Sequence, residues 1–137
     1  MVSQDSFSIS TSGRGIVEIT KQIAQRVESS NINTGICQVF THHTSASLII
    51  CENADPDVLR DLEVYMEGLV VDGDPRFIHT LEGIDDMPAH IRTILTNPNL
   101  SIPITNGRLA LGTWQGVFLW EHRLPPQRRH ITVTALG

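Results

Sequence analysis

Two short apolar runs separated by four polar residues constrain the fold of this chain more than any other feature. Residues 36–41 (ICQVFT) and 46–51 (ASLIIC) are apolar and rich in β-branched residues, a pattern typical of neighbouring strands in a buried sheet. The connection between them consists of His42, His43, Thr44 and Ser45. Because such a connection is held on a rigid base, we expect some of these side chains to converge on a ligand.

The N-terminal part predicts a strand, a turn and a helix. Residues 5–11 alternate between polar and apolar side chains, as a half-buried strand does. The segment 12–15 (SGRG) contains two glycines and indicates a turn. Isoleucine and valine then recur at intervals of three and four residues, so we expect an amphipathic helix from Ile16 to about Ser29.

The middle part predicts two helices separated by an acidic loop. Asp55 can accept hydrogen bonds from the free amides of a helix start, and Pro56 suits the first helical position. A helix should therefore follow over residues 57–70. Residues 72–86 (DGDPRFIHTLEGIDD) are rich in acids and turn formers, which predicts a long loop, and Pro88 fits the first turn of a short helix after it.

The last part predicts three strands. Residues 100–105 form a short strand in which Pro103 favours an edge position. An AsnGly dipeptide marks a tight turn, and a long strand with a break at Gly112 follows it. Residues 130–136 alternate as a final strand.

The order of these elements, β-α-β-β-α-α-β-β-β, indicates an α+β fold. We expect a mixed, largely antiparallel sheet with helices packed on it, because the regular strand-helix alternation of a doubly wound sheet is absent. A chain of 137 residues with 40% hydrophobic content can bury one continuous core, so residues 1–137 should form a single domain.

Charge and cysteine content narrow the possible partners and location. Ten basic against fifteen acidic residues give a net charge of -5, which argues against a nucleic-acid partner. The two cysteines lie inside apolar runs, as buried thiols in a reducing compartment do. The N-terminus lacks a basic start with an apolar segment, and no apolar run reaches the ~20 residues of a membrane span. We therefore expect a cytoplasmic protein that does not bind membranes.

The histidines are the strongest candidates for chemistry. His43, His79 and His90 each lie at the end of an apolar element, although they are far apart in the sequence. Three neutral imidazoles with an open fourth position suit zinc or a similar divalent metal. No HExxH or CxxC motif is present, so their convergence would depend on the fold. A structural role remains the alternative for each histidine, and we favour it for His42.

Other catalytic motifs are absent. The sequence has no GxSxG, no P-loop and no GxGxxG. A phosphate could still be held by Thr44, Ser45 and nearby amides, with help from Arg14, Arg108 or Arg123.

Five segments resemble one known family in order along the chain. They are HTSASL (43–48), ENADP (52–56), HTLEGIDDMPAHI (79–91), GRLALGTWQG (107–116) and EHR (121–123). Together they are similar to the YjbQ-like family, also called the secondary thiamine-phosphate synthase family. The GTWQ signature is the most specific of them, whereas the first 35 residues match only through the ArgGly turn.

The resemblance implies a compact α+β domain that assembles as a homotrimer with sites between subunits. It also implies that the metal ligands are His43, His79 and His90. The implied activity joins hydroxymethylpyrimidine diphosphate to a thiazole phosphate and releases pyrophosphate, as a secondary activity. Zinc is the expected metal, with magnesium as an option for the diphosphate substrate.

On this basis we assign roles to the remaining candidates. The expected catalytic residues are Glu82, Asp85, Thr44 and Ser45, and the expected substrate-binding residues are Asn53, Arg108, Thr113, Gln115 and Arg123. Two alternatives stay open: a zinc-dependent hydrolase of a small phosphoester or amide, and a non-enzymatic module that binds a small anion.

Overall fold

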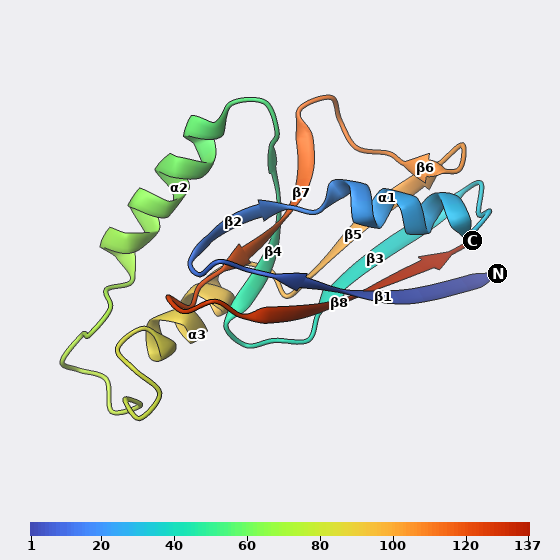
Figure 1. Cartoon of the computed structure of the whole chain (residues 1–137). Helices are drawn as coiled ribbons and strands as arrows, with labels where there is room; N and C mark the ends of the chain where they lie inside the picture. Colours follow the sequence, from blue (N-terminus) through green and yellow to red (C-terminus); the bar gives the residue numbers. More distant parts are fainter.

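The structure is a computed structural model that describes residues 1–137 and contains three helices and eight strands (Figure 1). The strands are β1 (Val2–Ser10), β2 (Gly15–Glu18), β3 (Gly35–Thr41), β4 (Ala46–Glu52), β5 (Asn99–Thr105), β6 (Arg108–Leu109), β7 (Gln115–Glu121) and β8 (Arg128–Leu136). The helices are α1 (Thr20–Ser29), α2 (Pro56–Leu69) and α3 (Asp86–Leu95).

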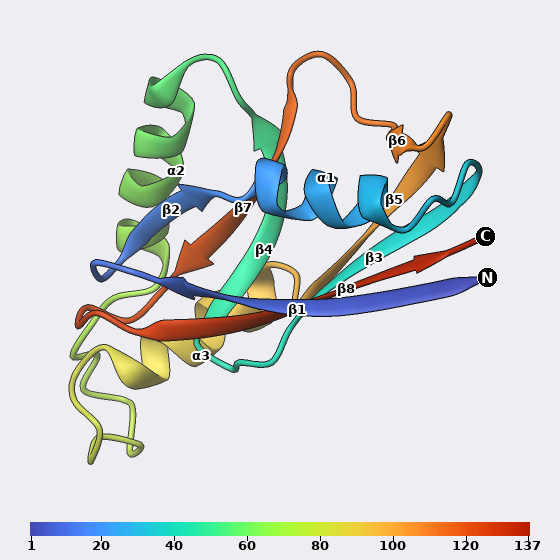
Figure 2. The ribbon, with the colours of Figure 1, turned by 45° about the vertical axis from the view of Figure 1, so that its right-hand side comes forward.

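The strands form two sheets in which every pairing is antiparallel. One sheet has the order β1-β8-β3-β5-β6, and the other has the order β2-β7-β4. The predicted α+β class and the order of elements are confirmed, with the short strands β2 and β6 added. The expected mixed sheet is absent, because no parallel pair occurs. Figure 2 shows α1 lying across the strands and α2 standing to one side of them.

The main hydrophobic core lies where α1 meets the two sheets. It contains 16 buried residues, and α1 contributes Ile23 and Val27, which lie one helical turn apart. A smaller cluster of Met66, Val70 and Trp120 joins α2 to β7. Trp120 also donates its indole N–H to Glu63 of α2 over 2.7 Å, so that the helix is fixed by a polar contact as well.

The predicted helix from Ile16 begins too early. Residues Gly15–Glu18 form β2 instead, in which Ile16 pairs with Trp120 of β7. Ile16 and Ile19 have helical spacing, but they are β-branched and equally suited to a strand. The neighbouring β7 decides between the two conformations, and the helix starts only at Thr20, whose hydroxyl accepts the Val117 N–H over 2.9 Å.

Pro103 does not place its strand at the edge of the sheet. β5 pairs with β3 along its length and with the two-residue β6 on its other side. β6 pairs only with Ile104 and Thr105, so it does not require an N–H from Pro103. The predicted start of α2 is confirmed: the Asp55 carboxylate accepts the Asp57 N–H over 2.9 Å, and Pro56 is the first helical residue.

The chain termini lie side by side at one end of the molecule (Figure 1). The N-terminal ammonium group donates to the carbonyl of Gly137 over 2.5 Å. At the opposite end, the segment between α2 and α3 extends away from the sheets. None of the three helices has the length and apolar character needed to cross a membrane.

Candidate metal centre

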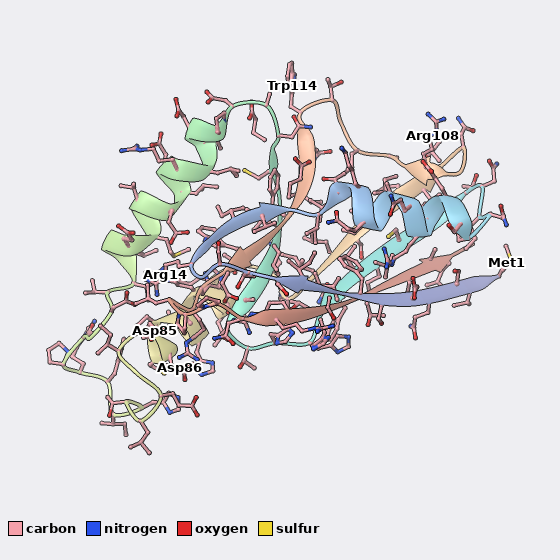
Figure 3. All side chains as sticks on the ribbon, in the orientation of Figure 1. Met1, Arg14, Asp85, Asp86, Arg108 and Trp114 are labelled. Carbon is pink, nitrogen blue, oxygen red and sulfur yellow. The ribbon has the colours of Figure 1, made fainter.

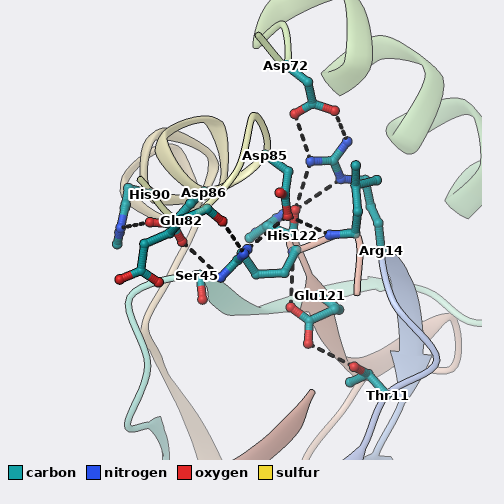
Figure 4. A network of polar contacts seen from close by, with 12 residues as sticks. Thr11, Arg14, Ser45, Asp72, Glu82, Asp85, Asp86, His90, Glu121 and His122 are labelled. Carbon is teal, nitrogen blue, oxygen red and sulfur yellow. Dashed lines mark hydrogen bonds and ion pairs between the residues drawn. The ribbon is translucent and has the colours of Figure 1, made fainter. Parts of the chain in front are cut away.

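The loop before α3 and the first two turns of α3 bring two histidines to one carboxylate. His79 comes from the loop, whereas Asp86 and His90 lie four residues apart on the same face of α3. The nearest nitrogen of each ring, Nε2, is 2.8 Å from Asp86 Oδ2 for His79 and 3.1 Å for His90. Figure 4 shows the contact between Asp86 and His90. These three side chains form the only group of metal-compatible ligand atoms within 4.8 Å of one another.

The hydrogen bond on the far side of His90 determines its tautomer. Nδ1 of His90 lies 3.1 Å from the carbonyl oxygen of Thr44, and a carbonyl can only accept. Nδ1 is therefore protonated, and the neutral ring turns the lone pair of Nε2 toward Asp86. Either a second ring proton or a bound cation between Nε2 and Asp86 would satisfy this geometry, so the arrangement is compatible with a cation site.

Arg123 supplies positive charge from the opposite side of Asp86. Its Nη1 is 3.1 Å from Asp86 Oδ1, and its Nε donates to Asp85 Oδ2 over 2.8 Å. Burial alone would raise the pKa of Asp86, but the hydrogen bond with His79 and the charges of His90 and Arg123 hold that pKa below its usual value. Asp86 is therefore a carboxylate near neutral pH and can bind a metal.

The residues present fit a divalent metal. Ligand atoms about 2.0 Å from a tetrahedral zinc ion are roughly 3.3 Å apart, close to the separations between Asp86 Oδ2 and the two imidazole nitrogens. Two imidazoles and a carboxylate are a usual ligand set for catalytic zinc, with a further position left open. His79 and His90 are partly exposed, with 49% and 30% of their side-chain surfaces accessible, so that a ligand could reach this position.

A groove of about 470 Å³ borders the cluster on the side of His90. Its walls are formed by His43, Thr44, His90, Thr93, Ile94 and Pro98. A second hollow of about 510 Å³ lies near the start of α1, lined by polar residues, and shares no residue with the cluster. A smaller hollow of about 180 Å³ is lined in part by His79, so the groove at His90 is the larger of the two spaces that border the cluster.

His43, the third predicted ligand, does not join the cluster. Its Nε2 accepts the backbone N–H of His130 over 2.7 Å, and its ring stacks on the ring of His130 with centroids 5.8 Å apart. Burial, together with the nearby charges of Arg129 and His130, lowers the pKa of His43. The cluster therefore contains Asp86 but not His43, and His43 lies in the wall of the groove.

The predicted catalytic residues lie around the cluster, but several serve structural contacts. Ser45 is buried, and its hydroxyl accepts a hydrogen bond from Arg129 over 3.0 Å. Asp85 is buried against Arg123 and accepts the Leu124 N–H over 2.9 Å. Thr44 contributes its carbonyl to His90, whereas Glu82 is exposed and its backbone carbonyl accepts a hydrogen bond from Arg123.

The predicted substrate-binding residues fall into two groups. Arg123 lies at the cluster, whereas Arg108 and Trp114 both lie far from Asp85 and Asp86, at two separate places on the molecule (Figure 3). At the 112–116 loop the Asn53 amide donates to the carbonyls of Thr113 and Gln115, and the Gln115 side chain accepts the Gly112 N–H. Asn53 and Gln115 therefore shape the loop that carries the exposed Trp114.

Asp86 is the member of the cluster that sequence reasoning missed. A carboxylate at the start of α3 also interacts favourably with the helix dipole, so its position alone does not indicate a metal site. The available signal was its spacing of four residues from His90, which places a carboxylate and an imidazole on one helical face. A search for two histidines at that spacing does not detect such a pair.

The fold and the cluster together define a small α+β protein with a candidate histidine–carboxylate metal centre. The chain belongs to the YjbQ-like family: the family model described as "UPF0047 protein YjbQ-like" matches residues 5–137. The relationship suggested by the sequence motifs is therefore confirmed.

Related sequences and solved structures are similar to this protein over almost its full length. UPF0047 protein sll1880 of Synechocystis is 52% identical over 134 residues, which cover 98% of this chain and 91% of the relative. UPF0047 protein YjbQ of Escherichia coli O157:H7 is 37% identical over 135 residues, covering 98% and 97%. The crystal structure of an uncharacterized conserved protein of the YjbQ/UPF0047 family from Clostridium acetobutylicum has a TM-score of 0.89 and 34% identity, covering 96% of this chain and 99% of that one.

Proposed function

We propose that this protein binds a divalent metal ion, zinc, through His79, Asp86 and His90 and acts on a small phosphorylated substrate. The observation that carries the proposal is the convergence of His79 Nε2 and His90 Nε2 on Asp86 Oδ2, at 2.8 Å and 3.1 Å. A divalent ion would supply positive charge to the phosphate oxygens of the substrate. The two free thiols, Cys37 and Cys51, are compatible with a cytoplasmic location.

The reaction that we propose is thiamine-phosphate synthesis as a secondary activity, supported by membership of the YjbQ-like family. Hydroxymethylpyrimidine diphosphate would be joined to a thiazole phosphate with loss of pyrophosphate. In this proposal the exposed carboxylate of Glu82 orients water or an ion beside the cluster, and the Thr44 hydroxyl contacts a phosphate oxygen.

The groove would hold the uncharged part of such a substrate. Several of its polar atoms are already engaged: His43 Nε2 accepts the His130 N–H, the Thr44 carbonyl lies within hydrogen-bond distance of His90 Nδ1, and the Thr93 hydroxyl donates to the Ala89 carbonyl. The surface that remains is mainly carbon, including the exposed side chain of Ile94. Apolar atoms of a ligand gain most from such a surface.

A homotrimer is part of the proposal. Large apolar side chains are exposed along α2 and after it, including Tyr65 at 72% and Leu69 at 56%. Contiguous exposed apolar surface is typical of protein interfaces. Trp114 lies far from Asp86 in one chain (Figure 3), so a site that used both would require two copies.

A zinc-dependent hydrolase of a small phosphoester or amide is the second candidate. Three protein ligands with an open position are the arrangement that catalytic zinc sites use to activate water, and the cluster is partly exposed. A hydrolase turns over one organic substrate alone, whereas a synthase requires both partners. A non-enzymatic anion-binding module would bind phosphate without any turnover.

The metal proposal is tested with ligand variants. Protein purified without chelator should contain zinc, and its affinity can be measured by competition with a chromophoric chelator. His79→Ala, Asp86→Asn and His90→Ala should each weaken zinc binding by more than the roughly 10–100-fold that outer-shell changes cause. His42→Ala is the control, because His42 is exposed and bonds to Thr132 away from the cluster, and it should change the affinity less than about twofold.

The reaction is tested on zinc-loaded protein. The two thiamine precursors together, each precursor alone, and a panel of phosphoesters and amides distinguish the synthase from the hydrolase. Metal-free wild-type protein, or a triple variant lacking His79, Asp86 and His90 ligands, that retains full activity would contradict the metal-dependent function.

A further inference from the structure

We infer that Arg123 is the positioning residue of the candidate metal centre: it holds the acidic loop against β7 and turns Asp86 so that one carboxylate oxygen faces the two histidines. This inference rests on the proposed metal site and adds a role for Arg123, which the sequence had suggested as a contact to substrate. Arg123 lies two residues beyond the last residue of β7, Glu121, and has 15% of its side-chain surface exposed.

All three nitrogens of the guanidinium group are engaged by the loop. Nε donates to Asp85 Oδ2 over 2.8 Å, and Nη2 donates to the carbonyl of Glu82 over 3.0 Å. Nη1 lies 3.1 Å from Asp86 Oδ1. Because a planar guanidinium presents its donors in a fixed geometry, these contacts fix the positions of Glu82, Asp85 and Asp86 relative to one another.

The two carboxylate oxygens of Asp86 have different partners. Oδ1 contacts Arg123, and Oδ2 is the atom that faces His79 and His90. Without the contact to Oδ1, the carboxylate could rotate about its terminal torsion, which is broad for aspartate. A metal would then have to order Asp86 on binding, and this ordering would cost affinity.

Arg123 also balances the charge of the loop. Asp85 and Asp86 are adjacent, and each is only 5% exposed. The hydrogen bond to Asp85 raises the pKa of Arg123, as do the charges of Asp85 and Asp86. Two neighbouring buried carboxylates repel one another unless a cation lies between them, so a loop without Arg123 should move outward.

Arg14 provides a matched control on the same face of the fold. It is similarly buried, with 9% of its side-chain surface exposed, and it donates to a carboxylate, Asp72, and to the carbonyl of His122. Figure 4 shows Arg14 bonded to Asp72 and not to Asp86. Removing Arg14 should therefore lower the stability of the fold about as much as removing Arg123, but it should leave the geometry of His79, Asp86 and His90 unchanged.

The test compares Arg123→Gln, Arg123→Lys and Arg14→Gln with the wild-type protein. Zinc affinity is measured by chelator competition, and hydrogen exchange of the amides of residues 82–86 is measured in metal-free protein. Arg123→Gln should weaken zinc binding about 10–100-fold, as changes to outer-shell partners do. Arg123→Lys should give an intermediate loss of zinc affinity, because an ammonium group keeps the positive charge but cannot donate in the planar geometry of a guanidinium group. Arg14→Gln should leave zinc affinity within about twofold of wild type.

The zinc affinities and the exchange rates test the role of Arg123 and the metal-binding function separately. Equal zinc affinity of Arg123→Gln and wild type overturns the inference, and so does an equal loss in Arg14→Gln, which would indicate a general loss of stability. If wild-type protein binds no zinc, the metal function fails, and the exchange data decide the role of Arg123. Faster hydrogen exchange at residues 82–86 in Arg123→Gln than in Arg14→Gln supports the inference that Arg123 holds this segment in place, and equal exchange contradicts it.

Discussion

The buried residue His122 should make the stability of this fold depend on pH. Its ring is fully buried at the end of β7, with Nε2 2.8 Å from the hydroxyl of Ser47. Burial, together with the positive charges of Arg92, Arg14 and Arg129, lowers the pKa of His122 to about 3. The ring is therefore neutral in the folded protein at any moderately acidic pH, whereas in the unfolded chain it titrates near its usual value of about 6.5.

This difference predicts a loss of stability in mild acid. Between about pH 6.5 and pH 3 the unfolded chain binds a proton at His122 that the folded protein does not, so the free energy of unfolding falls as the pH is lowered. The slope from this residue can reach about 1.4 kcal/mol per pH unit. Urea unfolding between pH 5 and pH 7.5, with a chelator present, measures it.

His122→Gln should flatten this dependence even though it lowers overall stability, because the titrating ring is gone. His42→Gln should leave the slope unchanged, since His42 is exposed at the end of β3. An unchanged slope in His122→Gln would show that other groups account for the acid sensitivity.

At the level of elements, the sequence predicted those features that depend on residues within one helical turn, and it failed for those that depend on distant strands. The start of α2 was predictable because Asp55 and Pro56 act within one turn. β2 was not, because its conformation depends on pairing with β7, about 100 residues away in the sequence. For the same reason His79 and His90 could be chosen by residue type, whereas the orientation of His43 depends on the backbone of His130 in β8.

The pairing of β3 with β8 carries an element-scale prediction at Gly35. A Cβ atom at this position would overlap the carbonyl oxygen of Leu136, a backbone atom that cannot move without separating the two strands. Gly35→Ala should therefore destabilise the protein by about 1–3 kcal/mol, as overpacking does. Urea unfolding measures this change in the free energy of unfolding.

Gly68 in α2 is the matched control. A Cβ added there meets no atom within 4 Å, so Gly68→Ala should stabilise the helix by up to about 1 kcal/mol. A neutral Gly35→Ala variant would mean that β3 and β8 separate at this end without cost.

At the level of the whole molecule, two separate places on the surface carry exposed apolar side chains. One end carries the cluster and its acidic loop, with the fully exposed apolar side chains of Ile78 and Leu81. Trp114 lies far from this end, on a loop that is held by hydrogen bonds of the Asn53 and Gln115 side chains (Figure 3). Exposed tryptophan on a rigid loop is typical of interaction hot spots, which supports the proposed homotrimer.

The homotrimer is tested through Leu69 on α2. Light scattering coupled to gel filtration should give three times the 15.2 kDa mass of the chain for wild-type protein. Leu69→Glu should shift the mass toward one chain at micromolar concentration, because it places a charge in the apolar surface that we propose to be buried between subunits.

Glu67→Lys is the control for the Leu69 variant, because it also changes an exposed charge on α2 but lies outside the apolar set. It should keep the wild-type mass. Since Leu69 is exposed in the single chain, Leu69→Glu should leave the circular dichroism of the fold intact, and the midpoint of thermal unfolding should lose its dependence on protein concentration. A wild-type protein with the mass of one chain, or a Leu69→Glu variant with an unchanged mass, would exclude an assembly through this face of α2.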